Sequence, residues 1–423
     1  MYPIKIKQKK GKSFFGQKLS SITAAQLLKL NLRGKALGIQ NKKEISKIKD
    51  QSDAKAKKIY EDLIKKEKNI VIFRASEGFG RDEVAESFKA SDIIINNSLK
   101  SQLSEIKLAI SEKKNIFKAK NNQSYKILNA ITDVIENTNS FANNLDDQEL
   151  EEIKKSEAGA SSIISTGKLI EEIGNCPDYY ADFIFSKIPR AKIKEFKKNP
   201  IDPEKSARNA NYCLTILKRI SEANKISIND LEIILMDRER ETLRLEKLKS
   251  IQKKYPDLKI TLIKDGTVAH AIAANLGLSN IKKHKIIMTV GAAPEGFFNL
   301  SFASAFSQKG AIASLRIYSK NIGKEKNLDK RYSFSKDEIK RIKELRKDDA
   351  LEILAGKKLF TQNSFKGDVD GAYSLITHSG VFSLEGVKKI DKNKYLVNLI
   401  NFQKKENESF FWIEKKKIDF SKK

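Results

Sequence analysis

LEIILMDRERETLRLEKL (231–248), LKITLIKDGTVAHAIAANLG (258–277) and HKIIMTVGAAPEGFFNLSFA (284–303) follow one another in the second half of this 423-residue chain. Each begins with a short apolar run rich in β-branched residues, continues through a polar turn and ends in a segment with helical spacing. Strands that alternate with helices in this order usually pair in parallel, because each helix returns the chain to the start of the next strand. The three segments therefore predict an α/β fold.

The three polar turns carry the residues that are best suited to ligand binding or catalysis. They read Asp237-Arg238-Glu239-Arg240, Asp265-Gly266-Thr267 and Gly291-Ala292-Ala293-Pro294-Glu295-Gly296. Open α/β sheets hold their ligands at the carboxyl ends of their strands, which is where these turns lie. Arginines, acids and a Gly/Pro-rich turn at one sheet edge suit a phosphorylated small molecule together with a divalent metal.

The order and spacing of these turns resemble the class II fructose-1,6-bisphosphatases, whose strand ends read roughly (D/K)RPRH or KPRH, DGD and GGAPEG. Segment 159–188, with CPDYYADF, is similar to the family's strand and APDxYM(D/E)K motif, and segment 365–387 is similar to its GDxVxFxATGxTxGxLLxGV stretch. Most of 45–400 aligns, apart from an insertion at 101–156. The resemblance implies the family's fold of layered sheets and helices.

The same resemblance implies an activity, a cofactor and an assembly. The expected reaction is the metal-dependent hydrolysis of the 1-phosphate of fructose 1,6-bisphosphate, a step of gluconeogenesis, with Mg²⁺ or Mn²⁺ as the ion. The expected partner is a phosphorylated sugar, and the expected assembly is a homo-oligomer, a dimer or a tetramer.

Carried over position by position, the resemblance implies a metal site made of carboxylates. Asp53 matches an acid at the start of an N-terminal helix, Glu77 matches the first Glu of the GEGExDEAP loop, and Glu295 is the Glu of APEG. Asp82 matches an acid that can orient or deprotonate the attacking water.

Two further ligands come from the family's DPxEGT motif, which follows the next strand. In this alignment Asn96 occupies the Asp position and Leu99 the Glu position, so two negative charges are missing. A neutral amide oxygen binds a divalent cation less strongly than a carboxylate, and a leucine cannot bind it. This leaves two alternatives: an active sugar-phosphate phosphatase, or a catalytically inactive descendant that binds a sugar phosphate or a protein partner.

The residues that the resemblance implies for substrate binding match the family more closely than the DPxEGT ligands do. Arg238 and Arg240 can clamp phosphate oxygens with their forked donors. Asp265 and Gly266 match an acid and a close-approach glycine that contact sugar hydroxyls, and Tyr180 matches the family's substrate tyrosine.

Three positions in these motifs depart from the family. The His that follows the second basic residue is Glu241, the second Asp of DGD is Thr267, and the second Gly of GGAPEG is Ala292. A methyl group at Ala292 could crowd a ligand that binds the backbone N–H there.

The charge is unusual for a soluble protein, since 82 Lys+Arg against 54 Asp+Glu give +28. Lysines spread over solvated faces explain this better than a polyanion site, because basic runs such as 5–12 and 415–417 are short and near the termini, and nucleic acid is not an expected partner. No run of about 18 apolar residues and no apolar signal core occur, so no membrane segment is expected. Two cysteines (Cys176, Cys213) and three scattered histidines (His270, His284, His378) favour a reducing cytoplasm and no zinc site.

The chain divides, by composition and motifs, into a basic N-terminal extension (1–40), an N-terminal α/β domain (41–225, with the insertion 101–156), a second α/β domain (226–350) and a C-terminal segment (351–423). The insertion carries no substrate motif and is expected to be a surface appendage or an oligomer contact. The expected elements are strands at 69–73, 91–98 and 310–319, helices at 101–114, 204–222 and 333–349 (with Ser335 and Glu338 as a capping box), and a hairpin of 394–402 with 409–420.

Overall fold

The computed structural model describes residues 70–77, 107–110, 125–136, 159–165, 179–264, 266–278, 283–319, 321–322, 331–345, 349–365, 367–375, 379–384, 388–405 and 408–419, the first four ranges by their backbone. The chain forms two compact units. One comprises Asp178–Lys366 with the first two residues, and the other comprises Pro3–Pro177 and Gly367–Lys423. We call them the smaller-sheet unit and the larger-sheet unit. Their boundaries differ from the divisions at 225 and 350 expected from composition.

The smaller-sheet unit is built on a six-stranded mixed sheet with the order β10-β9-β5-β8-β6-β7. As the sequence predicted, the three strands of the opening motif are parallel, with β6 between β7 and β8. β5 runs antiparallel to both β8 and β9. The strands are β5 (Tyr180–Lys187), β6 (Leu231–Met236), β7 (Lys259–Ile263), β8 (His284–Ala292), β9 (Ala311–Tyr318) and β10 (Phe360–Thr361).

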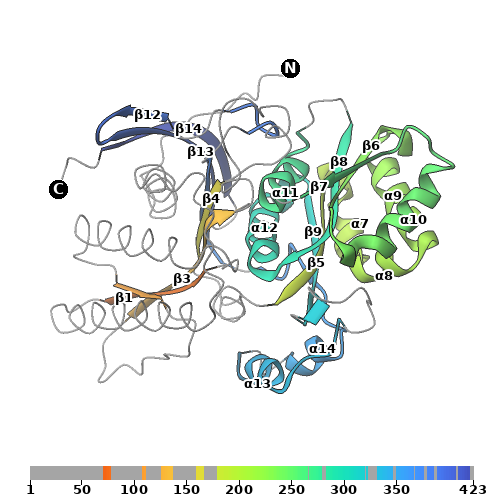
Figure 1. Ribbon diagram of the computed structural model, residues 1–423, viewed down its shortest axis with the longest axis horizontal. Helices are drawn as coiled ribbons and strands as arrows, with labels where there is room; N and C mark the ends of the chain where they lie inside the picture. Colours follow the sequence, from red (N-terminus) through yellow and green to blue (C-terminus); the bar gives the residue numbers. More distant parts are fainter. Residues whose placement is uncertain are drawn as a thin grey trace. The chain divides into compact units, whose positions relative to one another are not determined.

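Helices cover both faces of this sheet, so the unit has three layers (Figure 1). α11 and α12 pack on one face, against β5, β8 and β9. On the other face, apolar side chains of α7, α9 and α10 share one core with residues of β6 and β8, including Leu217, Leu248, Ile233 and Met288. Every residue of β6 is buried, as expected for a strand covered on both sides.

The expected helix over 204–222 is two helices, α8 (Pro203–Arg208) and α9 (Ala210–Asn224). Asn209 separates them, because its backbone is extended and its side chain accepts hydrogen bonds from the N–H groups of Asn211 and Tyr212. An Asn in this role satisfies N–H groups that a helix start leaves unpaired, and so it begins a new helix.

The expected capping box of the helix after 333 is confirmed. The Glu338 carboxylate accepts a hydrogen bond from the Ser335 N–H, and the Ser335 hydroxyl accepts one from the Glu338 N–H. None of the described helices is long and apolar enough to cross a membrane. The remaining helical elements are η2 (Arg190–Lys192), α7 (Ile193–Lys198), η3 (Ile228–Asp230), η4 (Glu239–Glu241), α10 (Thr242–Gln252), α11 (Thr267–Leu276), α12 (Ala293–Phe306), η5 (Ser307–Lys309), α13 (Lys336–Leu345) and α14 (Ala350–Leu354).

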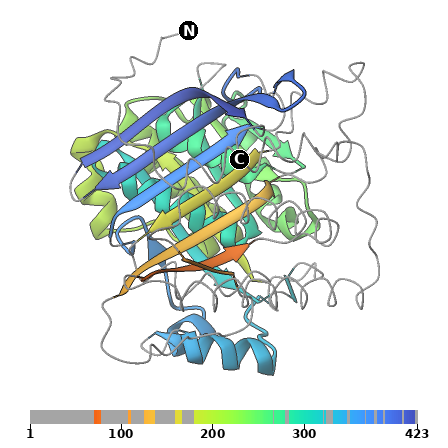
Figure 2. The same cartoon turned by 90° about the vertical axis from the view of Figure 1, so that its left-hand side faces the viewer.

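The larger-sheet unit contains an eight-stranded sheet of order β12-β13-β11-β4-β3-β1-β2, in which β14 also pairs with β13 (Figure 2). The expected C-terminal hairpin is present as β13 and β14, and the expected strand near 69–73 is β1. The strands are β1 (Ile70–Glu77), β2 (Lys107–Ile110), β3 (Tyr125–Glu136), β4 (Gly159–Ser165), β11 (Val369–Leu375), β12 (Lys388–Asp391), β13 (Lys394–Lys405) and β14 (Glu408–Asp419).

The segment 101–156 supplies two of these strands. β3 lies between β1, to which it is parallel, and β4, to which it is antiparallel. β2 pairs with the other edge of β1, within the segment 101–114 where a helix was expected. The helix prediction is therefore wrong at Lys107–Ile110, and the two described pieces of the segment, Lys107–Ile110 and Tyr125–Glu136, are strands of the sheet. The expected strand at 91–98 lies outside the described residues.

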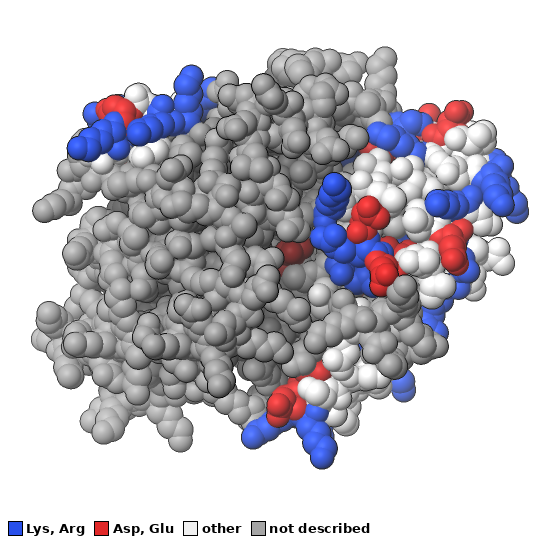
Figure 3. Space-filling view, viewed as in Figure 1, with Lys and Arg blue, Asp and Glu red and all other residues white. Residues whose placement is uncertain are grey.

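The described basic side chains of the smaller-sheet unit are interspersed with acidic ones on the face seen in Figure 3. Lys192 forms a surface pair with Glu195, and the exposed Lys259 pairs with the buried carboxylate of Glu232. This mixture agrees with lysines distributed over solvated faces.

Candidate functional site

Five predicted site residues of the smaller-sheet unit lie at one edge of its sheet. Gly266 is one of them, because it follows the carboxyl end of β7, which is parallel to β6. Arg238 and Arg240 follow the carboxyl end of β6, and Glu295 follows the carboxyl end of β8. Because β6 and β8 are parallel, these ends meet at the same edge. Tyr180 begins the antiparallel strand β5 opposite Ala292, at the end of β8, so it reaches that edge as well.

Arg240 is the centre of this group. Its Nε–H donates a hydrogen bond to the Val290 carbonyl at 2.9 Å, and its guanidinium lies 4.9 Å from the centroid of the Tyr180 ring. Burial lowers the pKa of Arg240, while Tyr180, Glu241 and Glu295 act in the opposite direction. No carboxylate of the described residues forms an ion pair with Arg240. A partly buried guanidinium that forms no ion pair with a described carboxylate favours an anionic ligand.

Glu295 lies in the first turn of α12, where a helix N-terminus favours negative charge. The Thr267 hydroxyl donates a hydrogen bond to its carboxylate. Thr267 is fully buried at the start of α11 and stands where the family has its second Asp. The replacement therefore exchanges a carboxylate for a hydroxyl that holds Glu295.

Two glycines let the backbone approach the site closely. Gly266 precedes α11 with φ 88°, a backbone conformation that residues other than glycine rarely adopt. At Gly291, an added Cβ would lie 3.1 Å from Glu295 Oε2 and 3.0 Å from the Phe183 ring. Ala292, in contrast, has φ −66° and needs no glycine for its backbone conformation.

Glu241, at the position of the family's His, is buried with 2% of its surface exposed. Its Oε1 accepts hydrogen bonds from the Thr289 hydroxyl, at 2.6 Å, and from the Val290 N–H. Its Oε2 accepts one from Arg244 Nη1 at 3.0 Å. All these partners are protein groups, so Glu241 ties η4 to β8.

Arg244 joins this residue to β5. Its Nη2 lies 2.6 Å from both carboxylate oxygens of Asp182, and the Tyr318 hydroxyl donates to Asp182 Oδ2 at 2.9 Å. Asp182 and Arg244 are 0% and 1% exposed. The sequence did not single out either residue, since Arg244 lies in LRLEKL, a pattern typical of a solvated helix face.

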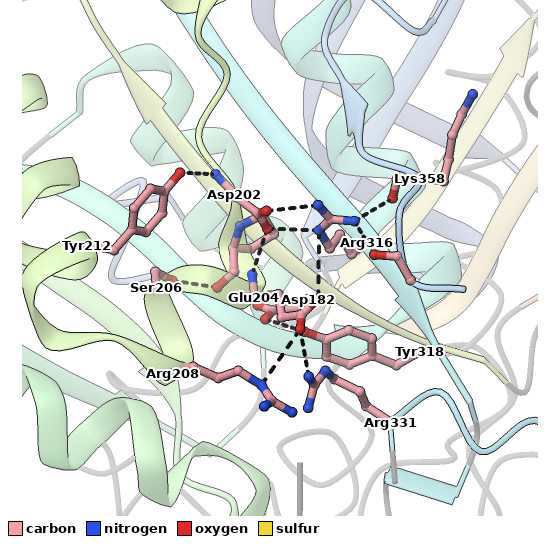
Figure 4. A network of polar contacts seen from close by, with 12 residues as sticks. Asp182, Asp202, Glu204, Ser206, Arg208, Tyr212, Arg316, Tyr318, Arg331 and Lys358 are labelled. Carbon is pink, nitrogen blue, oxygen red and sulfur yellow. Dashed lines mark hydrogen bonds and ion pairs between the residues drawn. The ribbon is translucent and has the colours of Figure 1, made fainter. Parts of the chain in front are cut away.

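A second buried ion-pair group connects β9 with α8. Arg316 lies 2.8 Å from each carboxylate oxygen of Asp202, which caps α8 (Figure 4). Arg331 Nη2 lies 2.6 Å from Glu204 Oε1, and the Tyr332 hydroxyl donates to Glu204 Oε2. These pairs hold the helical layer to the sheet and contain none of the predicted site residues.

The other predicted site residues are not placed. Asp53, Asp82 and Asp265 lie outside the described residues, as do Asn96 and Leu99. Glu77 is the last residue of β1, and its side chain is not described. Within the described part of the chain, no three His, Cys, Asp or Glu side chains are grouped so that they could hold a metal ion.

β3 carries a carboxylate pair that the sequence analysis missed. It runs parallel to β1, with Thr132 opposite Glu77, and its carboxyl end reads Asp133-Val134-Ile135-Glu136. Asn137 and Thr138 follow in the sequence, so the run is D-x-x-E-x-T, the spacing of the family's DPxEGT motif. The D-x-x-E-x-T spacing is visible in the sequence, but it lies within the segment 101–156, which aligns with no part of the family.

The family described as bacterial fructose-1,6-bisphosphatase, glpX-encoded, matches residues 153–366, just over half of the chain. No curated protein matches the sequence. The matched region spans β4 and the whole described smaller-sheet unit, including Tyr180, Arg240 and Glu295. The chain therefore belongs to the family of bacterial glpX-encoded, class II fructose-1,6-bisphosphatases.

Proposed function

We propose that this protein is an active, metal-dependent phosphatase that hydrolyses the 1-phosphate of fructose 1,6-bisphosphate. Membership of the family supports a fructose-bisphosphatase-like function in gluconeogenesis. The observation that carries the proposal is Arg240, a partly buried guanidinium beside Tyr180 with no carboxylate partner among the described residues. Such a group gains most from a phosphate, which it can bind with charged hydrogen bonds.

In this proposal Arg240 and Arg238 bind phosphate oxygens of the sugar bisphosphate. Arg240 donates its Nε–H to the Val290 carbonyl and Nη2 to the Met236 sulfur at 3.6 Å, a weak acceptor, so most of its Nη donors remain for the ligand. Tyr180, Asp265 and Gly266 bind the sugar, with the glycine allowing close approach of the backbone. The homo-oligomeric state remains an expectation from the family.

The carboxylates of the chain fit the ions that the family uses. Mg²⁺ and Mn²⁺ take oxygen ligands, and Glu295 offers a carboxylate held in place by the Thr267 hydroxyl. By resemblance the ligand positions of the family are Asp53, Glu77 and Glu295, and the spacing of the DPxEGT motif adds Asp133 and Glu136 as candidates. When bound, such an ion polarises phosphoryl oxygens and stabilises the leaving oxygen. Asp82 is the residue that would orient or deprotonate water.

Asp133 and Glu136 matter because they replace Asn96 and Leu99 in the assignment. The alternative of an inactive descendant rested on those two uncharged residues. β3 is the parallel neighbour of β1, so Asp133 and Glu136 lie on the backbone at the same sheet edge as Glu77. This placement favours the enzyme over the inactive descendant.

The test is phosphate release from fructose 1,6-bisphosphate with Mg²⁺ or Mn²⁺. We expect turnover by the wild type, and a loss of at least about 100-fold in kcat/KM for Glu295→Gln, Asp133→Asn and Glu136→Gln, because each ~1.4 kcal/mol of lost stabilisation costs tenfold. Asn96→Ala and Leu99→Ala serve as matched controls and should keep near wild-type activity. Absence of wild-type turnover would favour the inactive descendant. Activity that depends on Asn96 or Leu99 instead of Asp133 and Glu136 would overturn the ligand assignment.

A further inference from the structure

We propose that the buried Asp182–Arg244–Glu241 ion cluster is a positioning device that holds the Arg240 guanidinium beside Tyr180. The proposal deepens the function above and rests on it, because Arg240 matters only if it binds the phosphorylated ligand. The three cluster residues touch no ligand in this account and act through Arg240.

The first link is between η4 and β8. β6 pairs with β8 from Leu231 opposite His284 to Ile234 opposite Ile287. Three residues further along β8, at Val290, side chains of η4 form the backbone hydrogen bonds that a paired strand would otherwise form. Glu241 Oε1 accepts the hydrogen bond of the Val290 N–H, and Arg240 Nε donates to the Val290 carbonyl at 2.9 Å. Two consecutive residues thus fix η4 to both polar groups of one β8 residue.

The second link closes the cluster onto β5. Arg244 Nη1 donates to Glu241 Oε2 at 3.0 Å, and Nη2 lies 2.6 Å from both oxygens of Asp182. Asp182 is the register partner of Val290 on the neighbouring strand. The contacts therefore form a closed path, from Val290 through Glu241 and Arg244 to Asp182, which pairs with Val290. This closed path leaves η4 little freedom to move.

The third link is geometric. Tyr180 lies two residues before Asp182 on β5, and side chains two apart in a strand share a face. The cluster that fixes η4 to Asp182 therefore also fixes the distance between Arg240 and the Tyr180 ring, 4.9 Å from guanidinium to centroid. A phosphate clamp is most effective when its donors are held in place before the ligand arrives.

The test compares Arg244→Met with Arg316→Met, which breaks another short ion pair, with Asp202 at 2.8 Å, away from η4. Three measurements are made on the full chain: KM and kcat for fructose 1,6-bisphosphate, the affinity for inorganic phosphate by calorimetry, and the ¹⁵N NMR signal of the Arg240 Nε–H. We expect Arg244→Met to raise KM and the phosphate Kd by about tenfold with a smaller change in kcat, and to speed exchange of the Arg240 Nε–H. Arg316→Met should lower the thermal midpoint without these changes, and Arg244→Lys should recover part of the affinity.

Glu241→Gln provides a second variant if Arg244→Met does not fold, because it keeps the size of the side chain while removing its charge. It should raise the phosphate Kd in the same direction. Unchanged KM, phosphate Kd and Nε–H exchange in a folded Arg244→Met or Glu241→Gln protein would overturn the positioning role. If the wild type neither binds nor hydrolyses the sugar phosphate, the proposed function fails, while the Nε–H exchange still reports whether the cluster holds Arg240.

Discussion

Two arginines four residues apart show how partners decide the role of a charge. Arg244 lies between Asp182 and Glu241, and although burial opposes its charge, these carboxylates raise its pKa. Arg240 has no such pair among the described residues, and burial lowers its pKa. The charge of the first arginine is paired within the protein, so this residue is structural, whereas the second has donors left for a ligand.

The buried carboxylate of Asp182 makes the stability of the protein depend on pH. Burial raises its pKa from 3.8 to about 6, against the opposing effect of Arg244. Because the folded protein then binds this proton more tightly than the unfolded chain, its contribution to stability falls as pH rises from about 4 to about 6. We expect the urea midpoint of the wild type, relative to that of Asp182→Asn, to decrease over this interval and to level off above pH 7. A relative midpoint that rises instead would contradict the raised pKa.

At the scale of elements, the sequence predicts the helices and strands whose local residue patterns are strong. The buried runs of β6, β8 and β9 and the capping box of α13 are local signals, and all were predicted. β3 was missed because Tyr125–Glu136 mixes charged and amide residues with apolar ones, and its place between β1 and β4 depends on pairing with residues far away in sequence. The Asp182–Arg244 pair was missed for the same reason, since its partners are 62 residues apart.

The break between α8 and α9 can be tested at Asn209. Its side chain accepts from the N–H groups of Asn211, at 2.9 Å, and Tyr212, at 3.1 Å. Replacing it with Ala leaves both without this acceptor and should lower the free energy of unfolding by about 1 kcal/mol. Asn211→Ala is the matched control, because that side chain is exposed and lies just inside α9. Equal urea midpoints for the two variants would show that Asn209 does not start α9.

At the scale of the whole molecule, the family match and the sheet topology divide the chain differently. The match begins at 153 and ends at 366, so it includes β4 but neither β1 nor β3. The proposed metal ligands Glu77, Asp133 and Glu136 therefore lie before the matched region, and Glu295 lies within it. The proposed roles of Asp133 and Glu136 make the activity depend on the correct folding of β3.

The position of β3 makes this dependence testable. Ala130 lies in the middle of β3, opposite Ala75 of β1 and Ile164 of β4. A proline there removes a backbone donor from a strand paired on both sides, and each unmade buried hydrogen bond costs roughly 1–3 kcal/mol. Ala130→Pro should therefore abolish soluble folded protein or lower its urea midpoint strongly, with loss of phosphatase activity. Lys389→Pro in β12, which ends the sheet, is the matched control and should have a much smaller effect. If both variants fold with similar midpoints and activity, the segment 101–156 is an appendage after all, and Asp133 and Glu136 cannot be the metal ligands proposed here.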